Sequence, residues 1–323
     1  MKKSTPFFPI LLSALLSTAS LSSQETWEER AAERLKLLTE ENKRQISEAQ
    51  PTSPSAKRMG ARKILVFWRS EGFIHTSIPW ANHALAVMGR KAGAFEADFA
   101  DQYSVFSAEN LEQYDAIVFN NTTHLKFPRA NQRKAILEFI NGGKGVVGIH
   151  AASDNFYEWP AGAAMMGGQF CGHPWTSEST YAFKLDEPNH VLNDAFQGQG
   201  FWHKDEIYQY DPETYQGEEV LRVLISLDMT KESTAARLSD PKFEKHNAKF
   251  EPGVREVPVT WIRDHGKGRV FNTNFGHNES TFTNPAMMYQ LLDGIQYAIG
   301  DQKADATPSA KIKRPKPALA PER

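Results

Sequence analysis

The chain has 323 residues, of which 40% are hydrophobic and 24% charged, and these proportions suit one large folded domain or at most two small ones. Its formal net charge of −2 gives no reason to expect a nucleic acid or an acidic membrane surface as a partner. Cys171 is the only cysteine, which excludes a disulfide within the chain.

The N-terminus has the layout of a secretory signal peptide. Lys2 and Lys3 precede an apolar segment that ends in small residues, and this segment is too short for a helix that spans about 30 Å of hydrocarbon. We therefore expect a signal peptide at residues 1–23 and an exported, periplasmic product without stable membrane insertion after cleavage. An uncleaved anchor is the alternative.

Residues 24–60 predict an amphipathic helix followed by a linker. Apolar residues recur at intervals of three and four among charged ones. These apolar residues are Trp27, Ala31, Leu35 and Leu38. We expect a surface helix on a flexible lead, although its apolar side could also pack on the domain or on a partner.

Residues 61–300 predict one α/β domain. Its first half alternates apolar runs typical of buried strands with segments of helical spacing. The strands are expected at 63–67, 114–120 and 144–150, and the helices at 78–92 and 128–143. Short connections between such elements predict a parallel sheet covered on both faces.

The second half of the domain is less regular. Its strands are expected at 181–186, 219–228, 256–262 and 268–276, with a hairpin turn at 265–268 and a closing helix at 284–299. Asn284 and Pro285 have the residue types that begin helices. The tail at 301–323 is rich in Pro, Ala and Lys, and we expect it to be disordered because it cannot bury enough apolar surface.

Polar side chains follow the predicted strands, at the sheet edge where α/β proteins bind ligands. They are Arg69 and His75 after the first strand, Asn121 and Thr122 after the second, His150, Asp154, Tyr157, Glu158 and Trp159 after the third, and His277 after the last. Two further segments, 171–175 and 203–210, could close over this site. They carry His173, Trp175, Asp205 and Glu206.

Each of these residues also has an ordinary structural explanation. Asn and Thr after a strand are common turn residues, and Trp159 with Pro160 can simply begin a helix. His150 by itself is more typical of a hydrogen-bonded structural imidazole than of a catalyst. The site hypothesis therefore depends on several imidazoles and carboxylates meeting at one sheet edge.

Several segments, taken together and in order, resemble the trehalose-utilisation (ThuA-like) family over nearly all of residues 62–300. They include RSEGFIHTSIP, YDAIVFNNTT, FINGGKGVVGIHAASDNFYEWP, GQFCGHPW, HKDEIYQY and PVTWIRDHGKGRVFNTNFGH. The resemblance implies a flavodoxin-like, class I glutamine amidotransferase-like fold, a three-layer sandwich with a mostly parallel sheet. Asn272 departs from the family, whose members usually have Tyr there, which puts a substrate contact at that position in doubt.

The amidotransferases have a cysteine at the strand-to-turn position where this chain has His150. Cys171 lies elsewhere and no base motif accompanies it. Glutaminase chemistry needs a thiolate activated by a neighbouring base, so we do not expect it here.

The family's association with trehalose and keto-sugars implies a small-molecule carbohydrate as substrate. We expect an isomerase, epimerase or lyase of keto-sugars or keto-glycosides, which needs proton removal next to a ketone. The expected acid/base residues are His150, Asp154, Glu158 and His277. The expected substrate contacts are Arg69, His75, Asn121, Thr122, Tyr157, Trp159, His173, Trp175, Asp205 and Glu206.

A divalent metal such as Zn²⁺ could assist, because imidazoles with carboxylates suit that ion. Its expected ligands are His75, His150, His173 and His277, and the alternative is that these histidines bind no metal. Two other functions remain open at this point. One is a carbohydrate-binding protein without turnover, and the other is a glycoside hydrolase that uses two of the carboxylates.

Overall fold

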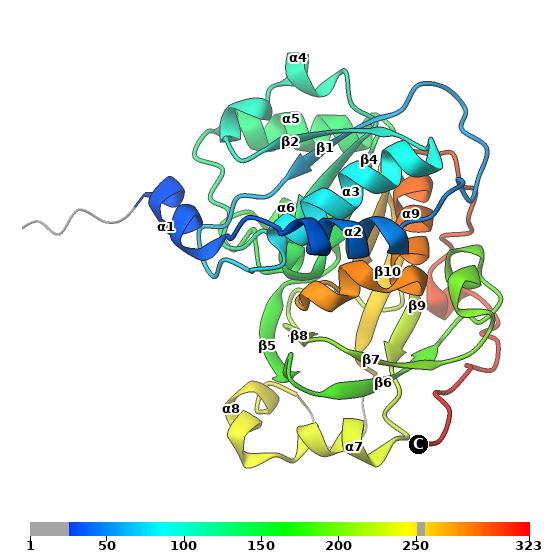
Figure 1. Ribbon diagram of the computed structural model, residues 1–323. Helices are drawn as coiled ribbons and strands as arrows, with labels where there is room; N and C mark the ends of the chain where they lie inside the picture. Colours follow the sequence, from blue (N-terminus) through cyan, green and yellow to red (C-terminus); the bar gives the residue numbers. More distant parts are fainter. Residues whose placement is uncertain (1–25, 251–255) are drawn as a thin grey trace, which may run out of the picture.

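The computed structural model describes residues 26–250 and 256–323, so the expected signal peptide at 1–23 lies outside the described residues. Within those ranges, nine strands form one sheet in the order β2-β1-β3-β4-β11-β10-β9-β6-β7, and β5 pairs separately with β8 (Figure 1). The strands are β1 Lys63–Phe67, β2 Glu96–Ala100, β3 Ala116–Asn120, β4 Gly145–Ile149, β5 Phe170–Trp175, β6 Thr180–Leu185, β7 Phe201–Lys204, β8 Ile207–Tyr210, β9 Arg222–Leu227, β10 Pro258–His265 and β11 Gly268–Thr273. The helices are α1 Trp27–Arg34, α2 Glu40–Ala49, α3 Ile78–Ala92, α4 Ala108–Leu111, α5 Ala130–Asn141, α6 Pro160–Met166, α7 Glu232–Ala235, α8 Glu244–Asn247 and α9 Pro285–Ala298.

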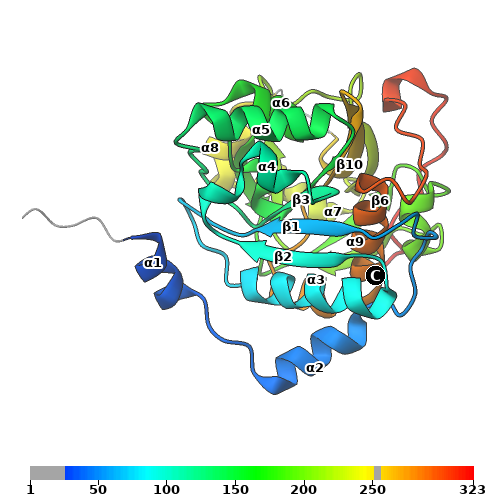
Figure 2. The ribbon, with the colours of Figure 1, turned by 90° about the horizontal axis from the view of Figure 1, so that it is seen from above.

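The first half of the domain confirms the predicted parallel sheet. β1, β3 and β4 pair in parallel, and β2, which the sequence analysis missed, extends the sheet beside β1. Every residue of β4 is buried, as is typical of a strand covered on both faces. Apolar residues of α3 and α9 pack on one face and those of α5 and α6 on the other, which gives two separate cores (Figure 2).

The second half makes the sheet mixed rather than mostly parallel. β11 lies parallel to β4 at the centre, whereas β10, β9, β6 and β7 continue in antiparallel pairs. The predicted hairpin turn is confirmed, since His265 pairs with Gly268 around Gly266, whose φ of +60° favours glycine. Tight hairpins of this kind can only join antiparallel strands, because a parallel connection needs a long crossover.

The segments 171–175 and 203–210, expected as closing loops, are partly strands instead. They contribute to β5, β7 and β8, and the pair of β5 and β8 lies beside the main sheet (Figure 1). Their many polar residues hide the two-residue period by which a strand is usually recognised.

The region 24–60 differs from the single exposed helix that was expected. It forms two helices, α1 and α2, because Leu35 adopts an extended conformation and Thr39 caps a new helix with its side chain. Both helices pack on the domain through buried residues, Trp27 in α1 and Ile46 in α2. Neither they nor any other described helix is long and apolar enough to cross a membrane.

The C-terminal tail was expected to be disordered, and the structure corrects this. Ala318 pairs with Leu185 of β6, the Ser309 hydroxyl accepts a hydrogen bond from the backbone of Val223, and Trp202 donates to the Pro321 carbonyl. Composition reflects only the apolar surface that the tail could bury. This tail is held mainly by backbone and side-chain hydrogen bonds to strands that already exist.

Candidate functional site

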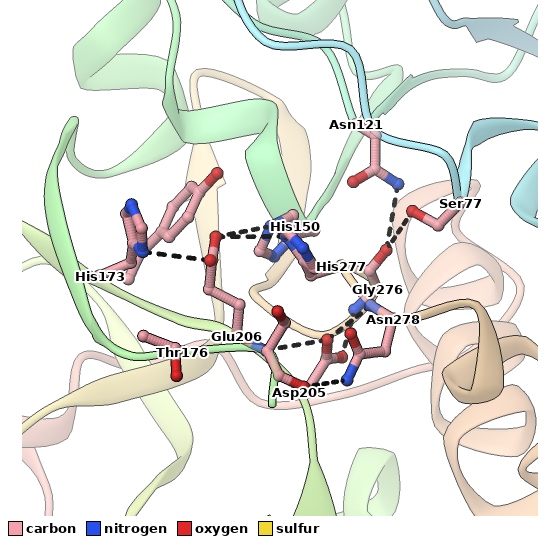
Figure 3. A network of polar contacts seen from close by, with 12 residues as sticks. Ser77, Asn121, His150, His173, Thr176, Asp205, Glu206, Gly276, His277 and Asn278 are labelled. Atoms are coloured by element: carbon pink, nitrogen blue, oxygen red, sulfur yellow. Dashed lines mark hydrogen bonds and ion pairs between the residues drawn. The ribbon is translucent and has the colours of Figure 1, made fainter. Parts of the chain in front are cut away.

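The candidate site lies at the carboxyl ends of the central parallel strands. His150 directly follows β4, His75 lies in the loop after β1, and His277 lies in the loop after β11. Glu206 joins them from the short link between β7 and β8 (Figure 3). Because parallel strands end at the same sheet edge, residues up to two hundred positions apart converge here, as the sequence analysis expected.

His150 is held in an unusual backbone conformation. Its φ of +47° is in the left-handed region, which costs a non-glycine residue about 1–2 kcal/mol. Its Nδ1 lies 2.8 Å from the carbonyl oxygen of Asn274, whose side-chain amide donates back to the carbonyl of His150. A carbonyl can only accept, so Nδ1 carries the proton and the lone pair of Nε2 is directed away from that contact.

Three imidazoles and one carboxylate form what we call the His–Glu cluster, namely His75, His150, Glu206 and His277. One donor atom from each residue lies within 4.8 Å of the donor atoms of the others. Nδ1 of His277 is 3.3 Å from Nε2 of His150 and 3.2 Å from Oε1 of Glu206. Nε2 of His150 is 3.7 Å from the same carboxylate oxygen (Figure 3).

These separations fit a transition-metal ion. Tetrahedral zinc with bonds of about 2.0–2.1 Å keeps its donor atoms about 3.4 Å apart, within the range of the three measured distances. Nδ1 of His75 is buried and finds no hydrogen-bond partner among the described residues, which a bound ion or water would change. The cluster thus offers four donor atoms, all within 4.8 Å of one another, that could hold Zn²⁺, with Glu206 in the place where the sequence analysis expected His173.

Burial sets the charge state of the cluster. Desolvation lowers the pKa of His150 to about 4 and that of His75 well below its ordinary value, so both rings are neutral near pH 7. Burial alone would raise the pKa of Glu206, but hydrogen bonds from His173 and His277 outweigh it and hold that pKa well below its usual range. Neutral imidazoles beside an ionised carboxylate are the protonation states that bind a metal.

His173 lies on the other side of the same carboxylate. Its Nδ1 is 3.1 Å from Oε2 of Glu206, and its side chain is 41% exposed (Figure 3). The hydrogen bond to Glu206 raises the pKa of His173. A more basic imidazole at the solvent edge can exchange protons with a ligand.

Asp205 supports the site from behind. Its carboxylate accepts hydrogen bonds from the backbone N–H groups of Gly276 and Asn278, at 2.7 and 2.8 Å, and from the Thr281 hydroxyl. Asn121 donates to the carbonyl of the same Gly276 (Figure 3). Asp205 and Asn121, both expected to touch substrate, instead fix the loop that carries His277.

Other predicted substrate contacts lie outside the cluster. Trp159 packs against Phe127 and Phe156 in the core, and Trp175 is fully buried with its Nε1 donating to the Thr234 carbonyl, so neither offers a face to a sugar. Thr122 is buried and accepts a hydrogen bond from Asn155. Arg69 binds Glu71 and stacks over Trp27 and Tyr103.

The two carboxylates after β4 have different surroundings. Glu158, expected to be catalytic, is exposed at the start of α6 and does not join the cluster, because the adjacent Trp159 is the residue turned into the core. Asp154 is buried, accepts a hydrogen bond of 2.5 Å from the Tyr157 hydroxyl and lies 3.4 Å from the exposed ring of His124. Asp154 and Tyr157 therefore form a separate polar pair on the rim.

Sequence reasoning missed two aromatic residues at the cluster. The buried ring of Tyr208 lies 4.6 Å from that of His150, and the ring of Phe73, 53% exposed, lies nearly parallel to that of His277. Tyr208 lies in β8, two positions after Glu206, which directly precedes that strand, so an extended backbone over 206–208 could have placed both on one side. Phe73 lies in a loop and had no such signal.

A hollow of about 330 Å³, open to solvent, borders the cluster at His277. The side chain of His277 is 20% exposed, whereas that of His150 is fully buried. The residues around the hollow are almost all polar or charged: Thr76, Ser177, Glu178, Lys204, His277, Asn278, Glu279 and Ser280. A polar ligand can therefore reach the cluster from this side.

The fold and site define an α/β protein with an imidazole–carboxylate centre at the edge of a mixed sheet. Residues 63–298 match the family described as ThuA, trehalose utilisation, and the chain belongs to that family. It is similar to the structure of a ThuA-like protein from Bacteroides uniformis, with 20% identity and a TM-score of 0.55 over 80% of this chain and 96% of the other. A ThuA-like protein from Parabacteroides merdae is 19% identical, with a TM-score of 0.53 over 75% and 91% of the two chains. At such identities the likeness concerns the fold, and no curated protein matches the sequence.

Proposed function

We propose that this protein is an isomerase, epimerase or lyase of keto-sugars or keto-glycosides, and that the His–Glu cluster is its active centre. The observation that carries the proposal is the convergence of three imidazoles and one carboxylate beside a polar hollow. The family's link to trehalose utilisation supports a sugar as the substrate.

The chemistry begins with proton removal from the carbon next to the ketone. The electron pair of that C–H bond forms a C=C bond, and the ketone oxygen gains negative charge. A Zn²⁺ ion held by His75, His150, Glu206 and His277 would supply electrophilic stabilisation of that oxygen. In a lyase reaction the C–O bond at the next carbon then breaks, whereas in an isomerase or epimerase the proton returns to carbon.

The chain offers an acid and a base outside the cluster. His173 is half-exposed and its pKa is raised by the hydrogen bond to Glu206, so its protonated form can donate to the departing oxygen. We assign the role of base to Asp154, a buried carboxylate that the Tyr157 hydroxyl holds at the end of the same strand as His150. Asp205 is not available for chemistry because backbone N–H groups already occupy its oxygens.

We also propose that the protein is exported to the periplasm and has a flavodoxin-like, three-layer sandwich fold. The signal-like residues 1–23 support export, and helices on both faces of the parallel strands support the fold assignment. N-terminal sequencing of the periplasmic fraction checks the export.

Incubation of the purified protein with 3-keto-trehalose or a 3-keto-glucoside tests the proposed activity. We expect NMR to show conversion of the keto-sugar, with unmodified trehalose left intact as the control. Elemental analysis after dialysis should find about one equivalent of a transition metal. Recovery of the keto-sugar bound but unchanged would favour the carbohydrate-binding alternative, and metal below about a tenth of an equivalent would remove the metal from the proposal.

Lys204→Ala tests whether the hollow holds the substrate. Lys204 is exposed and lines the hollow, where its ammonium group can donate to sugar hydroxyls. We expect KM to rise about tenfold with kcat within about twofold, because a contact to a distant hydroxyl affects binding of ground state and transition state alike. Lys134→Ala on the exposed side of α5 is the matched control. An unchanged KM would place the substrate elsewhere.

A further inference from the structure

The helix α1, which follows the expected signal peptide, covers the loop that carries His75. The guanidinium of Arg30 donates to three consecutive carbonyl oxygens of this loop, those of Ser70, Glu71 and Gly72, at 3.0, 3.2 and 3.2 Å. A planar guanidinium presents several N–H donors in a fixed geometry, which suits neighbouring acceptors of this kind.

Arg34, one helical turn later, binds the next part of the same loop. Its Nε donates to the carbonyl of Ile74 at 3.2 Å, and its guanidinium lies 5.2 Å from the centre of the Phe73 ring. The two arginines thus satisfy the backbone carbonyls of four of the five residues that precede His75. His75 itself is only 2% exposed.

Apolar packing fixes α1 against the same loop. Trp27 and Ala31 of α1 form a small buried cluster with Ile74 and Ile78, on either side of His75. Trp27 also donates a hydrogen bond from Nε1 to Asp101, which lies just after the neighbouring strand β2. A helix of eight residues is not stable alone in water, so α1 is ordered by this docking.

The loop is also attached to the end of β3, where the Ser70 hydroxyl donates to the carbonyl of Asn121 and the Thr123 hydroxyl donates to that of Phe73. Glu71 and Gly72 donate their N–H groups to the carbonyl of Thr123, which ties the loop to the end of β3. The carbonyls that point the other way are those bound by Arg30 and Arg34. Removal of α1 would leave these carbonyls to water and would expose Ile74 next to His75.

From these contacts we propose that α1 is a clasp that holds the loop 68–77, and that Arg30 is a positioning residue that keeps His75 in the His–Glu cluster. The consequence of these contacts for catalysis rests on the proposed function, whereas the placement of His75 by α1 does not. The region that the sequence analysis interpreted as a surface helix is then part of the active-site architecture.

Arg30→Ala in the full-length protein tests the clasp, with Arg30→Lys and Arg34→Gln as further variants. The matched control is Arg44→Ala, because Arg44 is exposed on α2 and, in the part of the chain that the structure describes, forms its ion pairs with Glu41 and Glu48 of its own helix. Two rates are measured in metal-free protein. One is the carbethoxylation of His75, monitored by mass spectrometry, and the other is the amide hydrogen exchange of residues 70–76. Neither measurement needs a substrate or a metal.

We expect Arg30→Ala to accelerate both processes at the loop by about tenfold or more, while exchange in β3 and β4 stays unchanged. Arg30→Lys should give a partial loss, because one ammonium group cannot reach three carbonyls in the same geometry. Arg44→Ala should behave as the wild type, and Arg34→Gln should loosen the loop in the same direction as Arg30→Ala.

Two results would overturn the clasp. One is that carbethoxylation of His75 is as slow in Arg30→Ala and Arg34→Gln as in the wild type. The other is faster exchange throughout the sheet, which would make Arg30 a residue of general stability. If the wild type turns over no keto-sugar, the proposed function fails, but the loop measurements still decide whether α1 positions His75.

Discussion

Glu206→Gln should reduce kcat for a keto-glycoside by about 10²–10⁴-fold while the protein stays folded. The substitution keeps the size of the side chain but removes the negative charge next to which three imidazoles lie. Glu206 lies 3.2 Å from Nδ1 of His277 and 3.1 Å from Nδ1 of His173. Without its carboxylate, His173 loses the partner that raises its pKa, and the cluster loses its only carboxylate.

The same variant should bind Zn²⁺ at least about 100-fold more weakly, which a competition titration with a chelator measures. The temperature of unfolding of the metal-free protein should change little, because the amide can still accept a hydrogen bond from one imidazole through its oxygen and donate one to another through its NH₂ group. Glu138→Gln, on the exposed side of α5, is the control and should behave as the wild type in both assays. Undiminished turnover by Glu206→Gln would remove the His–Glu cluster from the mechanism.

Asp293→Asn should raise the free energy of unfolding by about 3–4 kcal/mol at pH 8 and by only about 1–2 kcal/mol at pH 5. Asp293 lies on α9, is 4% exposed, and its Oδ1 finds no hydrogen-bond partner among the described residues. Burial raises the pKa of its carboxyl group from 3.8 to about 7, and the hydrogen bond with Ser55 offsets only part of this. The amide has the same shape and carries no charge.

The sign of the pH dependence follows from proton binding in the two states. Between about pH 4 and pH 7 the folded protein holds a proton on Asp293 that the unfolded chain has released, so stability contributed by this group falls as the pH rises through that window. Above pH 7 the folded state carries the whole cost of the buried carboxylate. Urea unfolding at pH 5 and pH 8 measures the difference for Asp293→Asn, with Glu138→Gln as the exposed control. Equal stabilisation at both pH values would contradict a raised pKa of Asp293 in the folded state.

The sequence was sufficient to predict the strands and helices whose apolar residues recur with a clear period. The strand at 63–67 and the helix at 78–92 have the expected boundaries, and Asn284 caps α9 as predicted. These elements are decided locally, by apolar spacing, by Pro and Asn at helix starts and by Gly at helix ends. The strands β2, β5, β7 and β8 carry more polar residues, and their pairing depends on partners distant in the chain.

The candidate site also depends partly on local sequence and partly on partners distant in the chain. That His75, His150 and His277 meet could be expected, because each follows a strand that ends at the same edge of a parallel sheet. The sequence could not show that Asp205 supports the loop of His277 while its neighbour Glu206 enters the cluster. Adjacent residues differ in direction according to the local backbone, and only the packed structure fixes that direction.

The sequence by itself determined the family, the parallel half of the sheet and the set of residues from which the site is drawn. The tertiary structure decided which of them share a pocket, and it moved Trp159, Trp175 and Glu158 out of the candidate set. It also showed that α1 and the C-terminal tail belong to the folded domain. The physical reason is that composition and periodicity describe what a segment can bury alone, whereas docking depends on hydrogen-bonding groups and apolar surfaces that other segments provide.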